Sequence, residues 1–368
     1  MKIPFINFDQ QNILIRDKIL ESVKKLFDSK NYVLGSNVSE FETKYSVINN
    51  SKYSIGIGSG LDALIISLKA LNVGKGDEVI IASNAYIASW LSISNVCATI
   101  IPIEPDSETF NIDVNKIEEK ISAKTKVIMP VHLFGQSCEM NKIMDIAKKY
   151  NLYVVEDNAQ AHLAKYDSKN TGTFGNINAT SFYPTKNLGA IGEAGCITTD
   201  DKDLRNFVLS YRNYGSSKKY VNDIIGTNSR LDEIQAGILS VKLKYLQKWN
   251  NDRKSIALKY NKLLSICDYV KIPKKLDKCD HVYHLYVIQS NKRDELQEYL
   301  LQNGIETSIH YPIPPHLQKA YAGLGYKQGD FPIAEKLAKT SLSLPIYPGL
   351  NDSEIQYICD IIIKFFKN

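Results

Sequence analysis

Between about residue 50 and residue 200 the chain alternates short apolar runs with helix-like segments. The apolar runs, which we predict to be strands, are 53–57, 78–82, 99–103, 127–133, 153–157, 179–183 and 196–199. Helices are predicted between several of them, at 61–71, 85–96, 112–121 and 138–150. Apolar runs without clean alternation indicate strands buried on both faces, and strand–helix alternation favours right-handed crossovers in a mainly parallel sheet. The predicted fold class is α/β.

The segments on either side of this region extend the prediction to two domains. An amphipathic helix is expected through about residue 30, and a long helical region over about 230–265. A smaller mixture of strands and helices follows, with 281–288 read as a strand. We therefore expect a large α/β domain over residues 1–245, which includes the N-terminal helix, and a small α+β domain over 246–368.

Charge and cysteine usage argue against several classes of protein. The formal charge of +5 is spread over 45 basic and 40 acidic residues without a long basic block, so nucleic-acid binding is not expected. The uncharged stretch 79–103 is long enough to cross a bilayer but contains too many polar side chains, so no membrane span is expected. The six cysteines lie far apart and no Cys/His cluster has zinc spacing, which predicts reduced thiols, no metal site and a cytoplasmic protein without a secretory signal.

In an open parallel sheet, ligands bind beyond the carboxyl ends of the strands, so the residues after each predicted strand are the candidates. The first strand is followed by "GSGLDAL", in which Ser59 and Asp62 form a capping pair at a helix start. Such a helix terminus can bind a phosphate, although a plain capped turn is the alternative. The same letters fit a dinucleotide pattern, but Asp77 and Glu78 precede the second strand instead of ending it, which weakens a nicotinamide site.

Two charged residues follow later strands. Asp157 ends the strand 153–157, where it can be a base, a metal ligand or a helix N-cap; no second carboxylate or histidine stands at metal spacing. Lys186 lies in a glycine-rich loop after the strand 179–183, with no other basic residue between Lys169 and Lys202. An exposed lysine needs no such setting, whereas a desolvated lysine has a lowered pKa and can act as a nucleophile.

A phosphate-binding helix end, a carboxylate and an isolated lysine on one sheet edge are the three partners that pyridoxal 5'-phosphate requires. The helix end holds its phosphate, the carboxylate keeps the pyridine nitrogen protonated, and the lysine bonds its aldehyde. The sequence therefore predicts a pyridoxal-phosphate enzyme.

With these residues in place, the chain closely resembles the nucleotide-sugar aminotransferases of the DegT/DnrJ/EryC/StrS family, which have the aspartate-aminotransferase fold. The resemblance runs over essentially the whole length. The motifs that carry it are "SFYPTKNLGAIGEAG", "VVEDNAQAHLA", "PVHLFGQ", "RNYGS", "NSRLDEIQAGIL" and "IHYPIPPHLQKAY".

The resemblance implies roles for individual residues. Lys186 matches the catalytic lysine that forms a Schiff base with the cofactor, Asp157 the partner of the pyridinium nitrogen, and Gln160 the residue that touches the ring hydroxyl. The remaining cofactor contacts that it implies are the stacking ring of Tyr86, the phosphate cradle of Gly60, Leu61 and Ser181, and Asn228, which reaches the phosphate of the neighbouring subunit. The active unit is therefore expected to be a homodimer with shared active sites.

Two departures from the family pattern stand out. Many relatives have threonine at the position of Leu61, so a hydroxyl contact is missing and backbone amides must suffice. "GEAG" replaces the more usual glycine pair and leaves the role of Glu193 open. A branch of the family that replaces the lysine with histidine is a dehydratase, and Lys186 argues against that activity.

The resemblance also implies a substrate. "NAYIASWLSIS" and "HYPIPPHLQKAY" are similar to the subgroup that aminates C3 of dTDP-3-keto-6-deoxyhexoses, with L-glutamate as the donor. A 4-keto sugar and a UDP- or GDP-linked substrate are the alternatives. His310 and Tyr311 lie where relatives contact the sugar or pyrophosphate, with Tyr183 and Arg212 as weaker candidates.

Two rival functions come from other classes. One is a nicotinamide-dependent sugar oxidoreductase, which would need the early glycine pattern to bind a pyrophosphate. The other is a cofactor-dependent regulator or a catalytically silent scaffold, which would keep the fold but should lose the lysine or the donor site. His132 and His162 are expected to be structural.

Overall fold

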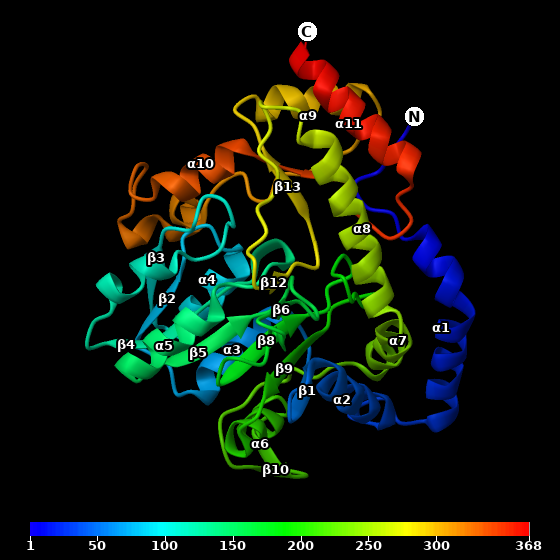
Figure 1. Cartoon of the computed structure of the whole chain (residues 1–368). Coiled ribbons are helices and arrows are strands. Elements are labelled where there is room, and N and C mark those ends of the chain that lie inside the picture. Colours follow the sequence, from blue (N-terminus) through cyan, green and yellow to red (C-terminus); the bar gives the residue numbers. More distant parts are fainter. Residues whose placement is uncertain (368) are drawn as a thin grey trace.

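The computed structural model describes residues 1–367, and its centre is one twisted seven-stranded sheet (Figure 1). The strand order is β1-β9-β8-β5-β4-β2-β3. The strands are β1 (Tyr53–Ile57), β2 (Glu78–Ala82), β3 (Thr99–Ile103), β4 (Thr125–Met129), β5 (Tyr153–Asp157), β8 (Ile177–Ser181) and β9 (Gly195–Thr199). Strand β9 runs antiparallel to both of its neighbours, and the other neighbouring pairs are parallel. The mainly parallel α/β sheet predicted from the sequence is confirmed.

Helices cover both faces of this sheet. They are α2 (Ser36–Asn49), α3 (Gly60–Ala70), α4 (Ile87–Asn95), α5 (Met140–Tyr150), α6 (Lys202–Tyr211) and α7 (Glu233–Leu243). In β2, Val79 and Ile81 join the core that includes Leu64 of α3 and Trp90 of α4, whereas Ile80 joins the core that includes Ile143 of α5. Because successive side chains of a strand point to opposite faces, an unbroken apolar run is what two covered faces require.

The first helix, α1 (Asp9–Ser29), packs against α7 at the side of the sheet (Figure 1). Only Ile15 and Leu26 of this helix are buried. Large apolar side chains elsewhere on it stay open to solvent, with Ile13 81% and Phe27 66% exposed. The amphipathic helix predicted from the sequence is present, but this single chain covers only part of its apolar surface.

A second hydrophobic core lies at the end of the molecule where both termini are found (Figure 1). Its elements are α8 (Leu246–Leu264), β13 (Tyr286–Gln289), α9 (Arg293–Gln302), β14 (Ser341–Leu344) and α11 (Asp352–Lys367). Helix α10 (Pro332–Thr340) precedes β14. Ile3 pairs with Ile305 and is buried in this core, so the N-terminal residues pack with the C-terminal part. The proposed division into residues 1–245 and 246–368 stays a prediction.

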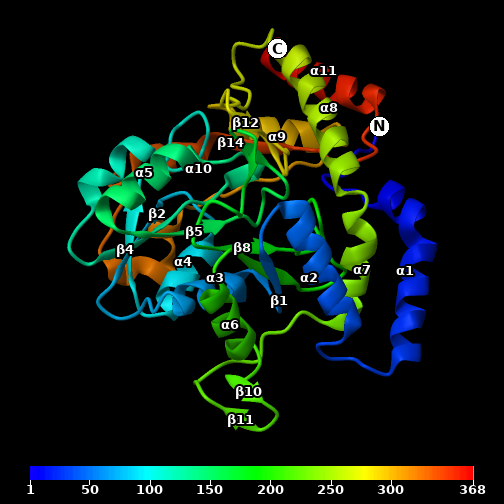
Figure 2. The same cartoon turned by 60° about the horizontal axis from the view of Figure 1, so that its bottom comes forward.

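Short elements complete the chain. They are β6 (Lys165–Tyr166), β7 (Lys169–Asn170), β12 (Cys279–Asp280), β10 (Ser216–Lys218) and β11 (Val221–Asn222), with 3₁₀ turns at Val114–Lys116, Glu118–Lys120, Leu133–Gly135, Pro315–Leu317 and Lys319–Leu324. The β10–β11 hairpin projects away from the body below α6 (Figure 2). Within residues 1–367, no helix combines the length and the apolar character needed to cross a membrane.

Some predicted elements were wrong in type or extent. Residues 112–121 form two 3₁₀ turns instead of an α-helix, with Val114 and Ile117 buried at the i, i+3 spacing that suits such turns. The strand 127–133 ends at Met129, because Pro130 follows and lacks an N–H for the sheet. The strand 281–288 begins only at Tyr286, because Tyr283 adopts a left-handed backbone conformation with φ 45°.

Candidate active site

The predicted site residues lie at the edge where the parallel strands end. Gly60 follows β1, Tyr86 follows β2, Asp157 ends β5, and Ser181 ends β8 with Lys186 in the loop beyond it. Antiparallel β9 begins at the same edge. The carboxyl edge of the sheet therefore holds one residue from each predicted part of a cofactor site, as expected for an open α/β sheet.

The start of α3 carries free backbone donors. The Ser59 hydroxyl accepts a hydrogen bond from Asp62 N at 3.1 Å, which confirms the predicted helix cap. Within residues 1–367, the N–H groups of Gly60 and Leu61 have no hydrogen-bond acceptor. A Cβ at Gly60 would lie 2.5 Å from Ser181 Cβ, so glycine is required for α3 and β8 to approach this closely. The N–H groups of Gly60 and Leu61 and the hydroxyl of Ser181 thus lie together at the start of α3, which suits a phosphate.

Asp157 is 5% exposed and both of its carboxylate oxygens accept hydrogen bonds. The Ser89 hydroxyl of α4 donates to Oδ2 at 2.7 Å, and Ala159 N donates to Oδ1 at 3.1 Å. No helix begins at Asp157, because turns follow β5, so the N-cap alternative is wrong. The carboxylate is buried and oriented at the sheet edge, as a partner for a positively charged ring nitrogen would have to be.

Lys186 sits in a tight turn, with its backbone N–H donating to Tyr183 O at 2.9 Å. Its side chain is half-buried. Burial lowers the pKa of its amine to about 8, and the nearby Asp157 carboxylate opposes this by raising the pKa. Lys186 is not an exposed residue, so the alternative of a surface lysine is wrong. An amine whose pKa is lowered to about 8 loses its proton much more readily than an ordinary lysine, and the neutral form can attack a carbonyl group.

The loop that carries Lys186 is held by buried polar side chains that were not predicted from the sequence. The Asn187 side chain donates to Asn250 Oδ1 at 2.8 Å and to Val282 O at 3.1 Å. The Lys242 ammonium of α7 donates to Gly189 O at 2.7 Å. Helices α7 and α8 therefore fix this loop from behind, and only the tertiary structure reveals these contacts.

Gln160 and Tyr311 are connected at the same edge. Gln160 Nε2 donates to the Tyr311 hydroxyl at 3.2 Å, and Gln160 Oε1 accepts from Phe134 N at 2.6 Å. The rings of Tyr86 and Tyr311 lie together, with centroids 4.9 Å apart and planes inclined by 32°. Burial raises the pKa of Tyr311, with the Asp157 carboxylate among the lesser causes, so the hydroxyl keeps its proton at neutral pH.

His310 lies next to this pair. Its Nδ1 is 2.8 Å from the Ser343 hydroxyl, and its ring stacks on Phe5 at 5.9 Å. Burial and the Lys186 ammonium together lower the pKa of His310 to about 4. The imidazole is therefore neutral at physiological pH and can exchange hydrogen bonds with an uncharged ligand group.

The other predicted residues lie farther out. Tyr183 is 46% exposed. Asn228 is exposed and lines a hollow of about 440 Å³ together with Ser59 and Glu193, next to the start of α3. The suggestion that Arg212 contacts a substrate is wrong, because its side chain is buried and donates to Glu42 and to Gly56 O.

His132 is structural, as predicted. It is fully buried, its Nε2 lies 2.7 Å from Glu156 Oε2, and its Nδ1 accepts a hydrogen bond from Cys138 N at 3.1 Å. Within residues 1–367 no group of three or more His, Cys, Asp and Glu side chains is arranged to hold a metal ion.

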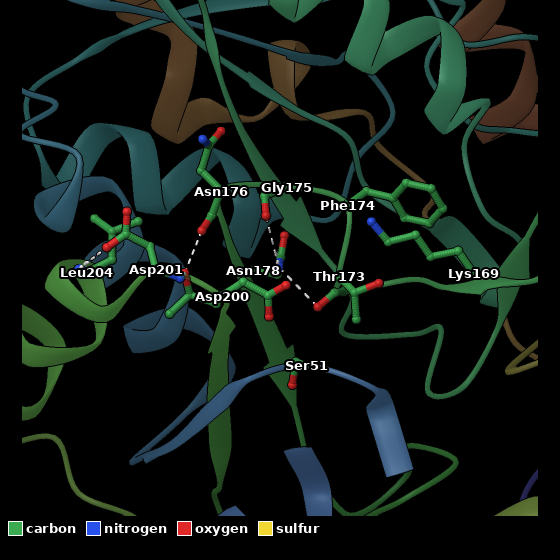
Figure 3. A pocket seen from close by; sticks show the side chains of 12 residues that line it. Ser51, Lys169, Thr173, Phe174, Gly175, Asn176, Asn178, Asp200, Asp201 and Leu204 are labelled. Carbon is green, nitrogen blue, oxygen red and sulfur yellow. Dashed lines mark hydrogen bonds between the residues drawn. The ribbon is translucent and has the colours of Figure 1, made fainter. Parts of the chain in front are cut away.

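A separate hollow of about 400 Å³ opens at the other end of β8 (Figure 3). Several of its polar side chains are used within the fold, whereas Ser51 Oγ and Asn178 Oδ1 have no hydrogen-bond partner among the described residues. Asp201 caps α6, Asn176 Oδ1 accepts from Val154 N, and Asn178 Nδ2 donates to Gly172 O. None of the predicted site residues lines this hollow, so it is separate from the candidate site.

The residues at the carboxyl edge fit pyridoxal phosphate. Free N–H groups at Gly60 and Leu61 suit a phosphate, the Asp157 carboxylate suits a pyridinium, and the Lys186 amine of lowered pKa suits an aldehyde. A dinucleotide needs an acid at the end of the second strand, and β2 ends in Ala82, so a nicotinamide site does not fit.

Comparison with known proteins supports the same assignment. The profile of the DegT/DnrJ/EryC1/StrS aminotransferase family matches residues 14–363. A relative from Aneurinibacillus thermoaerophilus, dTDP-3-amino-3,6-dideoxy-alpha-D-galactopyranose transaminase, is 46% identical over 363 residues, which cover 99% of each chain. The pleiotropic regulatory protein of Geobacillus stearothermophilus is 42% identical over 370 residues and all of both chains.

A solved structure agrees over the whole fold. The crystal structure of S. venezuelae DesV in complex with a ketimine intermediate superimposes with a TM-score of 0.98 at 37% identity, covering 100% of this chain and 99% of that one. The enzyme class and the pyridoxal phosphate dependence predicted from the sequence are those of the matched family. The chain belongs to the DegT/DnrJ/EryC1/StrS aminotransferase family.

Proposed function

We propose that this protein transfers the amino group of L-glutamate to the C3 keto group of a dTDP-linked 3-keto-6-deoxyhexose, giving a dTDP-3-amino-3,6-dideoxyhexose. The observation that carries the proposal is the Lys186 amine, whose pKa is lowered to about 8 and which stands beside the buried Asp157 carboxylate. Amino transfer needs a lysine that is neutral often enough to attack a carbonyl and to carry a proton between two carbon atoms.

The chain's residues would hold the cofactor at four points. Lys186 would bond its aldehyde, Asp157 its ring nitrogen, Gln160 its ring hydroxyl, and the start of α3 with Ser181 its phosphate. When bound, pyridoxal phosphate supplies an aldehyde that accepts an amino group and a protonated ring that withdraws electrons from the carbon losing a proton. Tyr86 would stack on the ring and exclude water from one face.

The Lys186 amine would then serve as the base and afterwards as the acid of the reaction. Its Nζ would take a proton from the α-carbon of glutamate, hold it, and release it again. The acceptor half-reaction uses the same group in reverse. Neutral His310 and protonated Tyr311 would orient the sugar, because both can donate a hydrogen bond without adding charge beside the amine.

The sugar assignment rests on the names of two relatives. One is the dTDP-3-amino-3,6-dideoxy-alpha-D-galactopyranose transaminase cited above. The other is the dTDP-3-amino-3,4,6-trideoxy-alpha-D-glucose transaminase of Streptomyces venezuelae, which is 37% identical over 361 residues, covering 98% of this chain and 95% of that protein. Both names place the amine at C3 of a dTDP-linked deoxyhexose, which favours a 3-keto over a 4-keto acceptor.

The test is a substrate panel. Purified protein, pyridoxal phosphate and glutamate are incubated with 3-keto and 4-keto sugars linked to dTDP, UDP or GDP, and each amine is identified by mass and proton NMR. We expect amination at C3 of the dTDP sugar and formation of 2-oxoglutarate. Amination only of a 4-keto sugar would refute the regiochemistry, and no amination of any sugar would refute the function.

We further propose a homodimer whose partner subunit completes each site. Apolar side chains exposed on α1 and just after it, including Ile13, Phe27 and Val33, form a surface that a monomer would leave in water. Val33 lines the same hollow as Ser59 and exposed Asn228, so this surface adjoins the proposed phosphate site. A cytoplasmic location is proposed because all six cysteines are free thiols.

A mixing experiment tests the shared site. Lys186→Ala and Asn228→Ala chains are co-expressed and compared with each variant alone. If Asn228 serves the partner's site, each mixed dimer has one intact site, and activity should return to about a quarter of the wild-type level. Activity no higher than the sum of the two separate variants would mean that Asn228 serves its own subunit.

The regulatory alternative has one observation in its favour, the name of the pleiotropic regulatory protein that is 42% identical. A regulator without catalysis has no need for a lysine of lowered pKa, and this chain has one at Lys186. Turnover in the substrate panel separates the two functions, since a silent regulator would bind the cofactor without producing 2-oxoglutarate.

A further inference from the structure

His162 lies outside the contacts proposed for catalysis, yet it bonds both ends of the loop that carries Lys186. Its side chain is fully buried. Nε2 is 2.9 Å from the carbonyl oxygen of Ser181, and Nδ1 is 3.3 Å from the backbone nitrogen of Leu188. A carbonyl oxygen only accepts and a backbone N–H only donates, so these partners require a neutral imidazole with its proton on Nε2.

The position of this ring is itself fixed. The imidazole stacks on Phe182, with centroids 5.6 Å apart and planes inclined by 16°. The backbone oxygen of His162 accepts from Asn250 Nδ2 at 2.9 Å, and Asn250 Oδ1 accepts in turn from Asn187. The ring therefore cannot leave the loop without breaking a buried network that includes the residue next to Lys186.

The charged groups around the Lys186 amine also favour an uncharged His162 ring. On β5, the Asp157 carboxylate raises the pKa of Lys186. His284 and His310 approach from other segments, and the Lys186 ammonium contributes to lowering the pKa of each. Burial, Lys186 and, less strongly, Arg253 of α8 lower the pKa of His162 to about 3. The ring is therefore uncharged throughout the range in which an aminotransferase works.

We propose that His162 is a positioning residue that acts through Lys186, because its neutral imidazole bridges Ser181 and Leu188 and so holds the loop in the geometry that keeps the amine shielded from water beside Asp157. The bridge also connects the loop of Lys186 with the proposed phosphate cradle, because Ser181 belongs to that cradle. Disrupting it should alter the lysine and the cradle together.

Three variants separate this role from simple core packing. His162→Phe keeps an aromatic ring against Phe182 but removes both hydrogen bonds. His162→Gln removes the ring but offers an amide that can donate and accept. His316→Phe is the matched control, because His316 is also buried but bonds Glu335 instead of the lysine loop.

The readout is the free amine of cofactor-free protein. Lys186 is labelled with acetic anhydride from about pH 6 to pH 11, and the pH profile of the modified peptide is measured by mass spectrometry. The wild-type midpoint should be near 8. In His162→Phe water reaches the amine, and a midpoint raised by about one unit would lower the neutral fraction at pH 8 about fivefold. His162→Gln and His316→Phe should stay within about twofold of wild type at pH 8.

Three results would overturn the proposal: a folded His162→Phe protein with the wild-type midpoint, a folded His162→Gln protein that behaves like His162→Phe, or an equal shift in His316→Phe. If the variants do not fold, ¹⁵N NMR of histidine in the wild-type protein decides. We expect His162 to keep the neutral Nε2–H form from about pH 5.5 to pH 9, and protonation within this range would contradict the bridge.

The inference rests on the proposed role of Lys186, but the two can fail separately. Borohydride trapping of pyridoxal phosphate on Lys186 of the wild-type protein tests the proposed function. Labelling of the cofactor-free amine tests the bridge, and its outcome does not depend on whether the cofactor is trapped.

Discussion

Gly60 offers a sharp test of the phosphate cradle, because its missing side chain lets α3 approach β8. A Cβ built at this position lies 2.5 Å from Ser181 Cβ and 3.0 Å from Ser181 Cα, whereas ordinary contacts begin at 3.4 Å. Gly60→Ala must therefore push the two segments apart by about 0.9 Å, and Ser181 cannot relieve the contact by rotating its side chain. Such overpacking costs about 1–3 kcal/mol of folding stability.

The same displacement should weaken phosphate binding. Hydrogen bonds to a charged group contribute about 1.5–3 kcal/mol each, so loss of one such bond corresponds to about 10- to 150-fold in affinity. Pyridoxal, which has the aldehyde and ring but no phosphate, should lose less than about threefold. The ratio of the two dissociation constants, measured by absorbance titration at pH 8, therefore reports on the cradle alone.

The control is Gly323→Ala, since a Cβ there has no atom within 4 Å. This variant should be neutral or more stable by about 0.4–1 kcal/mol, because alanine reduces the freedom of the unfolded chain. Urea unfolding of both variants shows that the comparison is made on folded protein. If folded Gly60→Ala binds pyridoxal phosphate as tightly as Gly323→Ala, the start of α3 is not the phosphate site.

Three further predictions concern side chains at or behind the site. Lys186→Ala should lower kcat at least about 1,000-fold and end borohydride trapping at this position; wild-type turnover in the variant would refute the assignment. Ser89→Ala removes the 2.7 Å hydrogen bond to Asp157 and should lower cofactor affinity about tenfold in an absorbance titration, which Ser89→Thr should largely restore. Burial lowers the pKa of Lys242 from 10.5 to about 8, so between these values the unfolded state binds more protons and this group makes stability rise with pH. In Lys242→Met the free energy of unfolding should not rise in this way. If urea unfolding from pH 8 to 10 gives the same pH dependence of this free energy for wild type and variant, the lowered pKa of Lys242 is refuted.

Much of the sheet was predictable because its signal is local. Each central strand is a short apolar run. Runs such as 78–82, in which polar and apolar residues do not alternate, indicate a strand buried on both faces. The errors lie where a neighbouring residue turns the backbone away from the strand that the apolar pattern predicts. The segment 281–288 is as apolar as a strand, but it bends at Tyr283, whose N–H is taken by His281 Nδ1.

The site residues also differ in how well the sequence predicts them. Residues that would touch the cofactor could be found, since the carboxyl edge of a parallel sheet selects Asp157 and Lys186 from their positions after strands. The residues that hold them could not. Ser89 is 68 positions away from Asp157, and Asn250 is 63 positions away from Asn187, the neighbour of Lys186 that it holds; nothing near them in the sequence indicates these contacts. Arg212 shows the opposite error, because it was predicted as a weaker candidate for a substrate contact whereas its partner is Glu42.

The proposed reactive groups share one structural property: each is held by an element other than its own. Asp157 ends β5 but is oriented by Ser89 of α4, and the loop of Lys186 is held by α7 and α8. Tyr86 is the N-cap residue of α4, so the first turn of this helix connects the ring that would cover the cofactor with the Ser89 hydroxyl that orients Asp157. A displacement of α4 should therefore affect stacking and the pyridinium contact together, whereas a displacement of α7 should affect the lysine first.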